Sequence, residues 1–167
     1  DNKLEVDANY KRMVHFGLTP ENACAVHLGI ASHNLFELAY AYQMAKANEV
    51  EAYYHFEMLE GMADHVRRAL SEESEEMLLY APVASRDEFI NAIAYLVRRL
   101  DENTEKENFL RYAPHLRVDS KEWYFLEEQF KDACRYRDKA GTQPHRIQDR
   151  NTEQFPESIG TYYHGEF

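Results

Sequence analysis

The sequence predicts an all-α fold, either a multi-helix bundle or stacked helical hairpins, with five to seven helices and an extended non-helical C-terminal arm. Glycine is scarce, with six in 167 residues, and the five prolines fall at expected helix edges or near the C-terminus. No sustained alternation of apolar and polar residues, the usual sign of a half-buried strand, is evident. A chain of this length suits one domain, which we place at residues 1–141, with the arm at 142–167.

Helix-start and helix-stop signals divide the N-terminal half. Gly17 follows the first helical pattern and favours a left-handed C-terminal cap. Pro20, preceded by Thr19, fits the first position of the next helix. These signals predict helices at residues 4–16, 20–46 and 49–70. Asn48 either breaks the last two apart or lies within one long helix.

The second half shows an acidic helix start and then three capping boxes, in which Ser, Thr or Asp is followed three residues later by Glu. Pro82 ends the first of these helices, because the residue before a proline avoids helical angles. Gly141 ends the last one. The expected helices lie at residues 71–80, 85–100, 104–112 and 119–140.

Charge and hydropathy exclude several classes of partner. The net charge of −11 disfavours phosphate backbones, so we expect no nucleic-acid binding. No apolar run reaches the roughly 20 residues that a spanning helix needs, so we expect no membrane insertion. Absence of a secretory signal favours a cytoplasmic protein. Because the sequence begins at Asp1 rather than Met, a removed N-terminal signal stays an alternative.

The common catalytic motifs are absent. The chain has neither the Gly-rich loop of dinucleotide-binding folds nor the phosphate-binding loop of nucleotide hydrolases. It also lacks the nucleophile elbow of the α/β hydrolases. These absences favour a non-catalytic helical accessory subunit or a protein-interaction module of a larger assembly, without a cofactor.

The arm is the expected docking segment. A purely disordered tail is poor in large apolar residues, whereas this one carries several. An arm of this kind can order on a partner through its aromatic anchors. We therefore expect another protein chain or a second copy to bind there. The candidate partner-binding residues are Phe155, Ile159, Tyr162, Tyr163 and Phe167.

A metal-binding helical bundle is the alternative function. Histidines and carboxylates concentrate between residues 27 and 65. His33 and Glu37 are four residues apart and would share a helical face, and Glu60 and His65 would face them from the next helix. Ferritin-like oxidoreductases and storage proteins hold metals in this way, although their Glu-x-x-His motif is missing here. The expected metals are iron, manganese or copper.

Two stretches resemble each other at a spacing of 32, the separation of Tyr80 and Tyr112 (112 − 80), each tyrosine being followed by Ala-Pro. This spacing is close to the length of a helix-pair repeat. It is equally explained by two helices that end and restart by the same local signals.

Overall fold

A computed structural model describes residues 2–74 and 76–143. It contains a parallel three-stranded sheet together with its helices, so the prediction of an all-α bundle is wrong. Strands and helices alternate along the chain, which is the pattern of an α/β protein.

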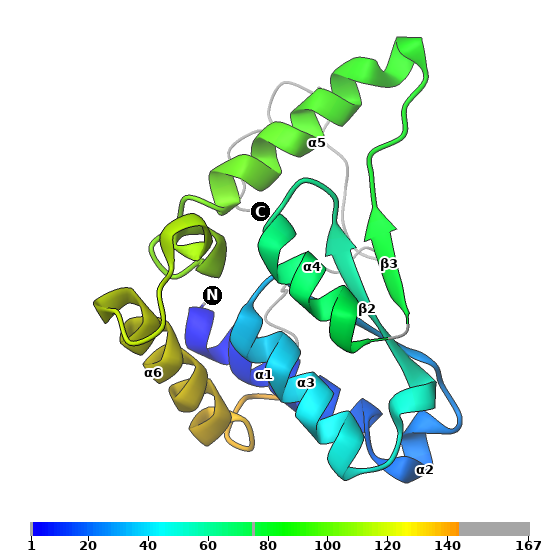
Figure 1. Cartoon of the computed structure of the whole chain (residues 1–167), viewed down its shortest axis with the longest axis vertical. Coiled ribbons are helices and arrows are strands. Elements are labelled where there is room, and N and C mark those ends of the chain that lie inside the picture. Colours follow the sequence, from blue (N-terminus) through cyan, green and yellow to red (C-terminus); the bar gives the residue numbers. More distant parts are fainter. Residues whose placement is uncertain (1, 75, 144–167) are drawn as a thin grey trace, which may run out of the picture.

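The first half of the chain holds the first two strands. Its elements are α1 (Lys3–Gly17), α2 (Pro20–Ala23), β1 (Leu28–Ala31), α3 (Leu35–Ala47), the short 3-10 helix η1 (Glu51–Tyr53) and β2 (Tyr54–Leu59). Figure 1 shows α1 and α3 lying beside the sheet and α2 at the end of α1. The expected helix at 4–16 is confirmed by α1, whereas the expected helices at 20–46 and 49–70 each contain a strand.

The second half adds the third strand and two longer helices. Its elements are α4 (Asp64–Glu73), β3 (Met77–Tyr80), η2 (Arg86–Glu88), α5 (Phe89–Glu102), η3 (Phe109–Arg111), η4 (Ala113–His115) and α6 (Lys121–Tyr136). The helix expected to end at Tyr80 is a strand for its last four residues. Residues 104–112 form only a 3-10 turn near their end, and α6 is capped by the Ser120 hydroxyl rather than by Asp119.

The sheet has the order β1-β2-β3, with every pair parallel. Ile30 pairs with Phe56 across the first two strands, and Phe56 pairs with Met77 across the last two. Each strand is connected to the next through a helix, α3 and then α4. Parallel strands need such crossovers, and nearly all crossovers are right-handed. Because the strands follow one another in order and both crossovers have the same hand, α3 and α4 lie on the same face of the sheet.

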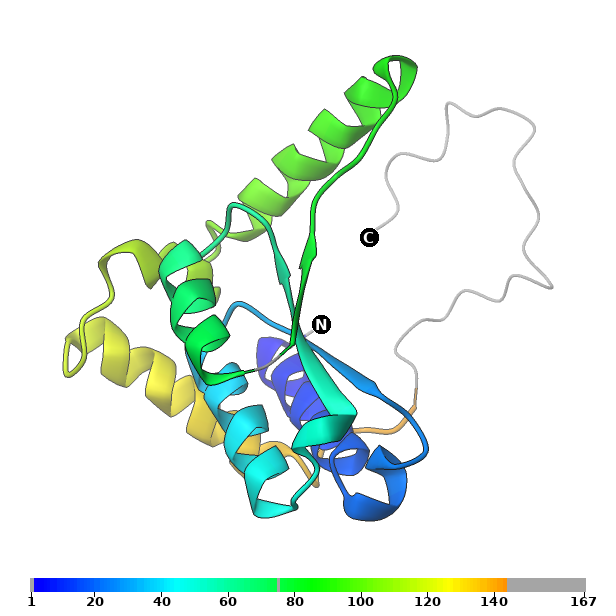
Figure 2. The ribbon, with the colours of Figure 1, turned by 45° about the vertical axis from the view of Figure 1, so that its right-hand side comes forward.

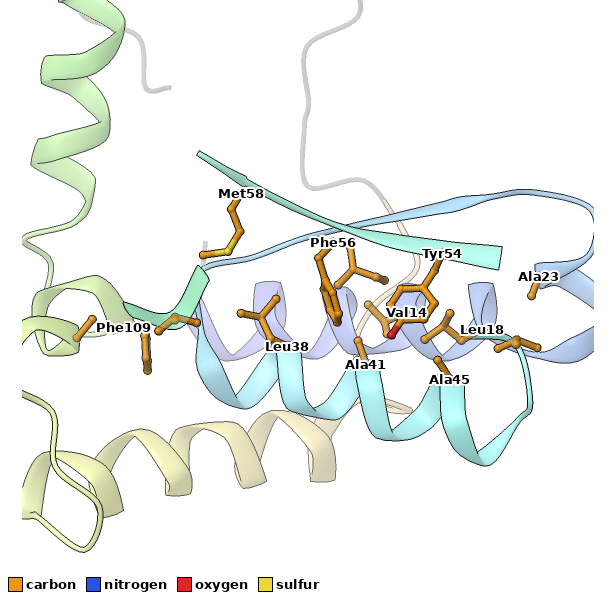
Figure 3. Packing of buried hydrophobic residues seen from close by; sticks show 14 of the residues in the cluster. Val14, Leu18, Ala23, Leu38, Ala41, Ala45, Tyr54, Phe56, Met58 and Phe109 are labelled. Atoms are coloured by element: carbon orange, nitrogen blue, oxygen red, sulfur yellow. The ribbon is translucent and has the colours of Figure 1, made fainter. Parts of the chain in front are cut away.

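The core lies between that face and its helices. The burial of β2 alternates, with Tyr54, Phe56 and Met58 buried. Figure 3 shows these side chains pointing from the strand toward α3, where they meet Leu38 and Ala41. Alanines on α3 let the helix approach the sheet closely, so the large side chains of the central strand supply most of the buried apolar surface.

The other face of the sheet is exposed among the described residues. Gly29 and Ala31 of β1 and Leu78 and Tyr80 of β3 are exposed there, on either side of Glu57. Exposed, polar-lined strand faces are unusual in parallel sheets, which are normally covered on both sides. This face is therefore available to further structure or to a ligand.

Of two expected helix ends, Gly17 differs from its expected role, and Asn48 breaks the helical pattern as one of its two alternatives predicted. Gly17 ends α1, but not through a left-handed backbone; a Cβ there would lie 2.7 Å from Leu28 Cδ2. Asn48 does end α3: its backbone caps the helix, and its side-chain amide donates to Leu18 O at 2.8 Å. Glu49 then takes a positive φ of 57°, which turns the chain toward β2.

The last two helices occupy different places. α6 packs on α1 and α3. There the Phe36 ring contacts Trp123 in a tilted arrangement and stacks with Phe130, at centroid distances of 4.9 and 5.9 Å. α5 stands away from this layer, beyond the end of β3, as Figures 1 and 2 show. Among the described residues none of the α5 side chains is buried, and Ile90 and Leu100 are among its exposed apolar side chains.

None of the helices within residues 2–74 and 76–143 is long and apolar enough to cross a membrane.

Candidate functional site at the carboxyl ends of the strands

The carboxyl ends of the three strands lie at one edge of the sheet, where parallel α/β folds bind their ligands. Ser32 and His33 follow β1, Glu60 and Gly61 follow β2, and Ala81 follows β3. Gly61 has φ of +78°, a backbone conformation that glycine adopts without strain. Among the pockets at this edge, two share Leu59, at the end of β2, in their linings.

The first pocket, called the His33 pocket, has a volume of about 330 Å³. Its walls come from α1, the end of β1, the start of α3, the end of β2 and the last turn of α5. The residues that α5 and the segment after β1 contribute to the lining are mostly polar. The lining includes Tyr10, His33, Glu37, Leu59, Arg99, Glu102 and Asn103.

His33 is fixed at the wall by a backbone contact. The Leu59 amide donates to its Nε2 at 3.2 Å, so the neutral ring carries its proton on Nδ1. That Nδ1 is buried and has no hydrogen-bond partner in the described part of the chain. Burial lowers the pKa of His33 from its usual value of 6.5. His33 therefore holds a buried N–H donor in the wall of the His33 pocket.

We expect His33 to make the fold acid-sensitive. Because its pKa is lower in the folded state, the unfolded chain binds more protons as the pH falls below 6.5, and stability declines with it. His33→Gln should reduce the loss of stability between pH 7.5 and 5.5, measured as the shift in urea midpoint. His65→Gln, at an exposed position on α4, is the control. An unchanged pH slope in His33→Gln would contradict the assignment.

The second pocket, called the Tyr80 pocket, has a volume of about 410 Å³ and lies between the end of β3 and α5. Tyr80 lines it from the strand end and Tyr95 from the helix. Leu59 and small apolar residues from the segment after β3, including Pro82 and Val83, add to the lining. The Tyr80 pocket therefore combines apolar and aromatic surface with two polar side chains, Glu88 and Asn91.

One stripe of α5 serves both pockets. Tyr95, Arg99 and Asn103 are successive at four-residue spacing, so they share a helical face. The Arg99 guanidinium carbon lies 5.5 Å from the Tyr95 ring centroid, and its Nη2 donates to Glu102 Oε1 at 2.7 Å. Among the described residues, Arg99 Nε is buried and has no hydrogen-bond partner. Arg99 thus places a cation in the lining of the His33 pocket, one helical turn from Tyr95 of the Tyr80 pocket.

A buried ion pair supports the far wall of the His33 pocket. The Lys11 ammonium of α1 contacts the Glu37 carboxylate of α3, and the two side chains are 0% and 8% exposed. Burial raises the pKa of Glu37, against the opposing effect of Lys11. Tyr10 donates to Ala31 O at 3.2 Å, and burial, assisted by Glu37, raises the pKa of its hydroxyl.

The four residues expected to bind metal are not brought together. His33 and Glu37 both line the His33 pocket, but Glu37 is paired with Lys11. Glu60 and His65 are exposed and line neither pocket. Within the described part of the chain, no three His, Cys, Asp or Glu side chains form a group that could hold a metal ion.

The expected partner-binding residues of the arm, from Phe155 to Phe167, lie outside the described residues. Of the expected arm at 142–167, the structure describes residues 142 and 143.

Sequential parallel βα units with a pocket at their carboxyl edge define the class of protein: an α/β protein of the kind that builds active sites from the loops after its strands. Residues 1–112 match the protein-family model described as proline dehydrogenase. Because this match covers more than half of the 167 residues, the chain belongs to the proline dehydrogenase family.

A solved structure agrees with this assignment. The chain resembles the structure of Proline Utilization A (PutA) from Corynebacterium freiburgense, at 35% identity and a TM-score of 0.69. The match covers 88% of this chain and 13% of that one, so the chain spans about an eighth of that protein's length. No curated protein sequence matches it.

The family assignment overturns the function expected from the sequence. A non-catalytic helical accessory subunit is wrong, because the family is one of enzymes. The metal-binding helical bundle is wrong as well, because the fold is α/β. Sequence reasoning also misses Tyr80, Tyr95 and Arg99 as site residues. The signal available for them was their position, because Tyr80 ends a strand and Tyr95 and Arg99 share one face of a helix.

Proposed function

We propose that this chain supplies the carboxyl-edge pockets of a proline dehydrogenase, with the carboxylate of proline bound by Arg99. The observation that carries the proposal is the Arg99 guanidinium in the lining of the His33 pocket, one helical turn from Tyr95 of the Tyr80 pocket, with a buried Nε donor that has no partner among the described residues. Within a chain of the proline dehydrogenase family, a cation so placed matches the one permanent negative charge of the amino acid.

The Tyr80 pocket suits the ring of proline. A pyrrolidine ring is small and mostly apolar, and the lining by Leu59, Tyr80 and Tyr95 offers apolar and aromatic surface. Arg99 lies against the Tyr95 ring. A ring seated between the tyrosines would therefore direct its carboxylate toward the guanidinium.

The His33 pocket suits an electron acceptor. Dehydrogenation of an amine moves a hydride from the carbon next to nitrogen, while nitrogen loses a proton and a C=N bond forms. A nicotinamide or flavin supplies the hydride-accepting ring when bound. His33 Nδ1–H, a buried donor without a partner among the described residues, and Asn103 in the same lining are the groups that would donate to such a ring's acceptor atoms. Leu59 lines both pockets, so a ligand in one would lie beside a ligand in the other.

The three βα units are those of a barrel arc. A closed (β/α)₈ barrel arranges its strands in sequential order with all helices outside, as β1-β2-β3 with α3 and α4 do. The exposed face of this sheet would then be the inside of the barrel. Within the described residues the outer edges of β1 and β3 are unpaired. These edges and the exposed apolar face of α5 would meet the remaining strands and helices.

The proposal is tested by calorimetric titration of the full chain with proline and with pyrrolidine, which lacks the carboxylate. We expect proline to bind more tightly. Arg99→Met should weaken proline binding by roughly tenfold or more, because a charged hydrogen bond is lost, and should leave pyrrolidine binding unchanged.

Arg68→Met is the matched control, since Arg68 is exposed on α4 and lines neither pocket. Equal affinity of the wild-type chain for proline and pyrrolidine would contradict the role of Arg99. Proline-dependent reduction of added flavin or nicotinamide, followed by absorbance, then identifies the acceptor.

We also propose a cytoplasmic location and an assembly with another protein chain or a second copy, as the sequence predicts. The net charge of −11 suits a cytoplasmic protein, and the aromatic residues of 142–167 suit contact with another chain or a second copy.

A further inference from the structure

The open face of the sheet carries a hydrogen-bonded cluster whose members other than Tyr80 line neither pocket. The Glu57 carboxylate of β2 lies at its centre. Its Oε1 is 2.9 Å from His55 Nε2, and its Oε2 accepts from the Tyr80 hydroxyl at 3.1 Å. The His55 ring stacks on His27, with centroids 5.1 Å apart. Only Tyr80 reaches from this cluster to the site.

The position of Glu57 is set by its neighbour on β1. A Cβ at Gly29 would lie 2.1 Å from Glu57 Oε1 and 2.6 Å from its Cδ. The carboxylate therefore rests over the glycine, where any other residue would displace it. Gly29 has an ordinary negative φ, so its need for glycine is one of space.

We propose that Glu57 is a positioning residue, which holds Tyr80 at the edge of its pocket so that the ring forms the floor for proline. The inference rests on the proposed function. Tyr80 is half exposed on an edge strand, so few packing contacts fix its ring. The bond to Glu57 supplies that restraint. It also commits the hydroxyl proton, so that the oxygen faces a ligand only as an acceptor.

The pKa of Tyr80 and the register of the two strands agree with this arrangement. Bonding to Glu57 raises the pKa of the Tyr80 hydroxyl above its usual value of 10.0. Glu57 and Tyr80 lie on adjacent strands, two positions out of register, since Leu59 is the residue paired with Tyr80. A diagonal pair at this spacing is within reach of a long acidic side chain.

The first experiment does not depend on proline. The full chain is labelled with [ζ-13C]tyrosine, the Tyr80 signal is assigned by its loss in Tyr80→Phe, and the tyrosine is titrated. We expect Glu57→Gln to lower the pKa of Tyr80 toward its usual value. We expect Gly29→Ala, which keeps Glu57 but displaces it, to do the same. An unchanged Tyr80 titration in both variants overturns the proposal.

The second experiment is a double-mutant cycle on proline affinity, measured by calorimetry. Glu57→Gln should weaken binding by about threefold or more, and the effect should vanish in the Tyr80→Phe background, because the two residues act through one bond. Glu60→Gln, an exposed carboxylate after β2 that lines neither pocket, should leave affinity unchanged.

The outcomes separate the two proposals. A wild-type chain that does not bind proline removes the proposed function, while the tyrosine titration still decides whether Glu57 holds Tyr80. Proline binding that Glu57→Gln leaves unchanged removes the positioning role and retains the function. The positioning role is likewise overturned if Glu57→Gln weakens proline binding equally with and without the Tyr80 hydroxyl.

Discussion

Lys11→Met is expected to lower the free energy of unfolding by about 3–5 kcal/mol, because it leaves a buried carboxylate without its counter-ion. The Lys11 side chain is fully buried and paired with Glu37, and its ammonium also lies 4.6 Å from the Phe130 ring centroid of α6. Urea unfolding at pH 7, followed by circular dichroism, measures the loss.

The double variant Lys11→Met/Glu37→Leu separates the pair from its packing. Replacing both charges by apolar groups of similar size removes the stranded carboxylate, so most of the lost stability should return. Lys3→Met is the control, because Lys3 pairs with Asp7 at an exposed position, where ion pairs contribute little. A double variant no more stable than Lys11→Met would contradict this account.

The pH dependence provides a second check on the same pair. Burial raises the pKa of Glu37, and loss of Lys11 removes the charge that opposes this rise. A raised folded-state pKa gives a contribution that is present at low pH and lost as the pH rises. Lys11→Met should therefore regain part of its stability, relative to wild type, on going from pH 7 to pH 5.

The sequence predicts those elements whose signals are local. α1 is recognised because a helical pattern runs up to Gly17, and α6 because a capping box at Asp119 opens a long pattern, although Ser120 is the residue that caps the helix. Even there the detail is non-local: Gly17 is needed for the approach of Leu28, eleven residues later (28 − 17). Helix ends are thus found from sequence, while the reasons for them come from packing.

The strands could not be predicted with equal ease, because a parallel strand gains its stability from partners far along the chain. β2 does alternate strictly from Tyr54 to Met58, but over only five residues, a length at which helix and strand patterns overlap. β1 contains Gly29, which weakens a strand signal. Its presence is explained only by Glu57 on the neighbouring strand.

The candidate site shows the same division. His33 and Glu37 are recognised as unusual by residue type, but four-residue spacing on a supposed helix suggests metal ligands. The structure places His33 after a strand and Glu37 on the helix that follows. Arg99 gives no distinctive local signal, since an arginine near a helix C-terminus is ordinary. Its importance appears only where α5 meets the strand ends.

Phe56→Ala is expected to destabilise the fold by about 3–5 kcal/mol, the usual loss when a buried phenyl ring is removed. Phe56 is fully buried on the central strand, and its ring meets Tyr54 edge-on at 5.2 Å. It pairs in register with Ile30 on one side and Met77 on the other. The cavity would therefore open where the sheet meets α3, and unfolding by urea should show a lower midpoint.

Phe89→Ala is the matched control, because Phe89 begins α5 and is 60% exposed. The same ring is removed, but little buried surface is lost, so we expect a change below about 1 kcal/mol. Equal losses in the two variants would mean that α5 is as firmly packed as the sheet, which would contradict the exposed apolar face described for it. A large loss in Phe56→Ala alone identifies the β2–α3 layer as the core. Both pockets depend on this core, because Leu59 ends β2 and His33 follows the neighbouring strand β1.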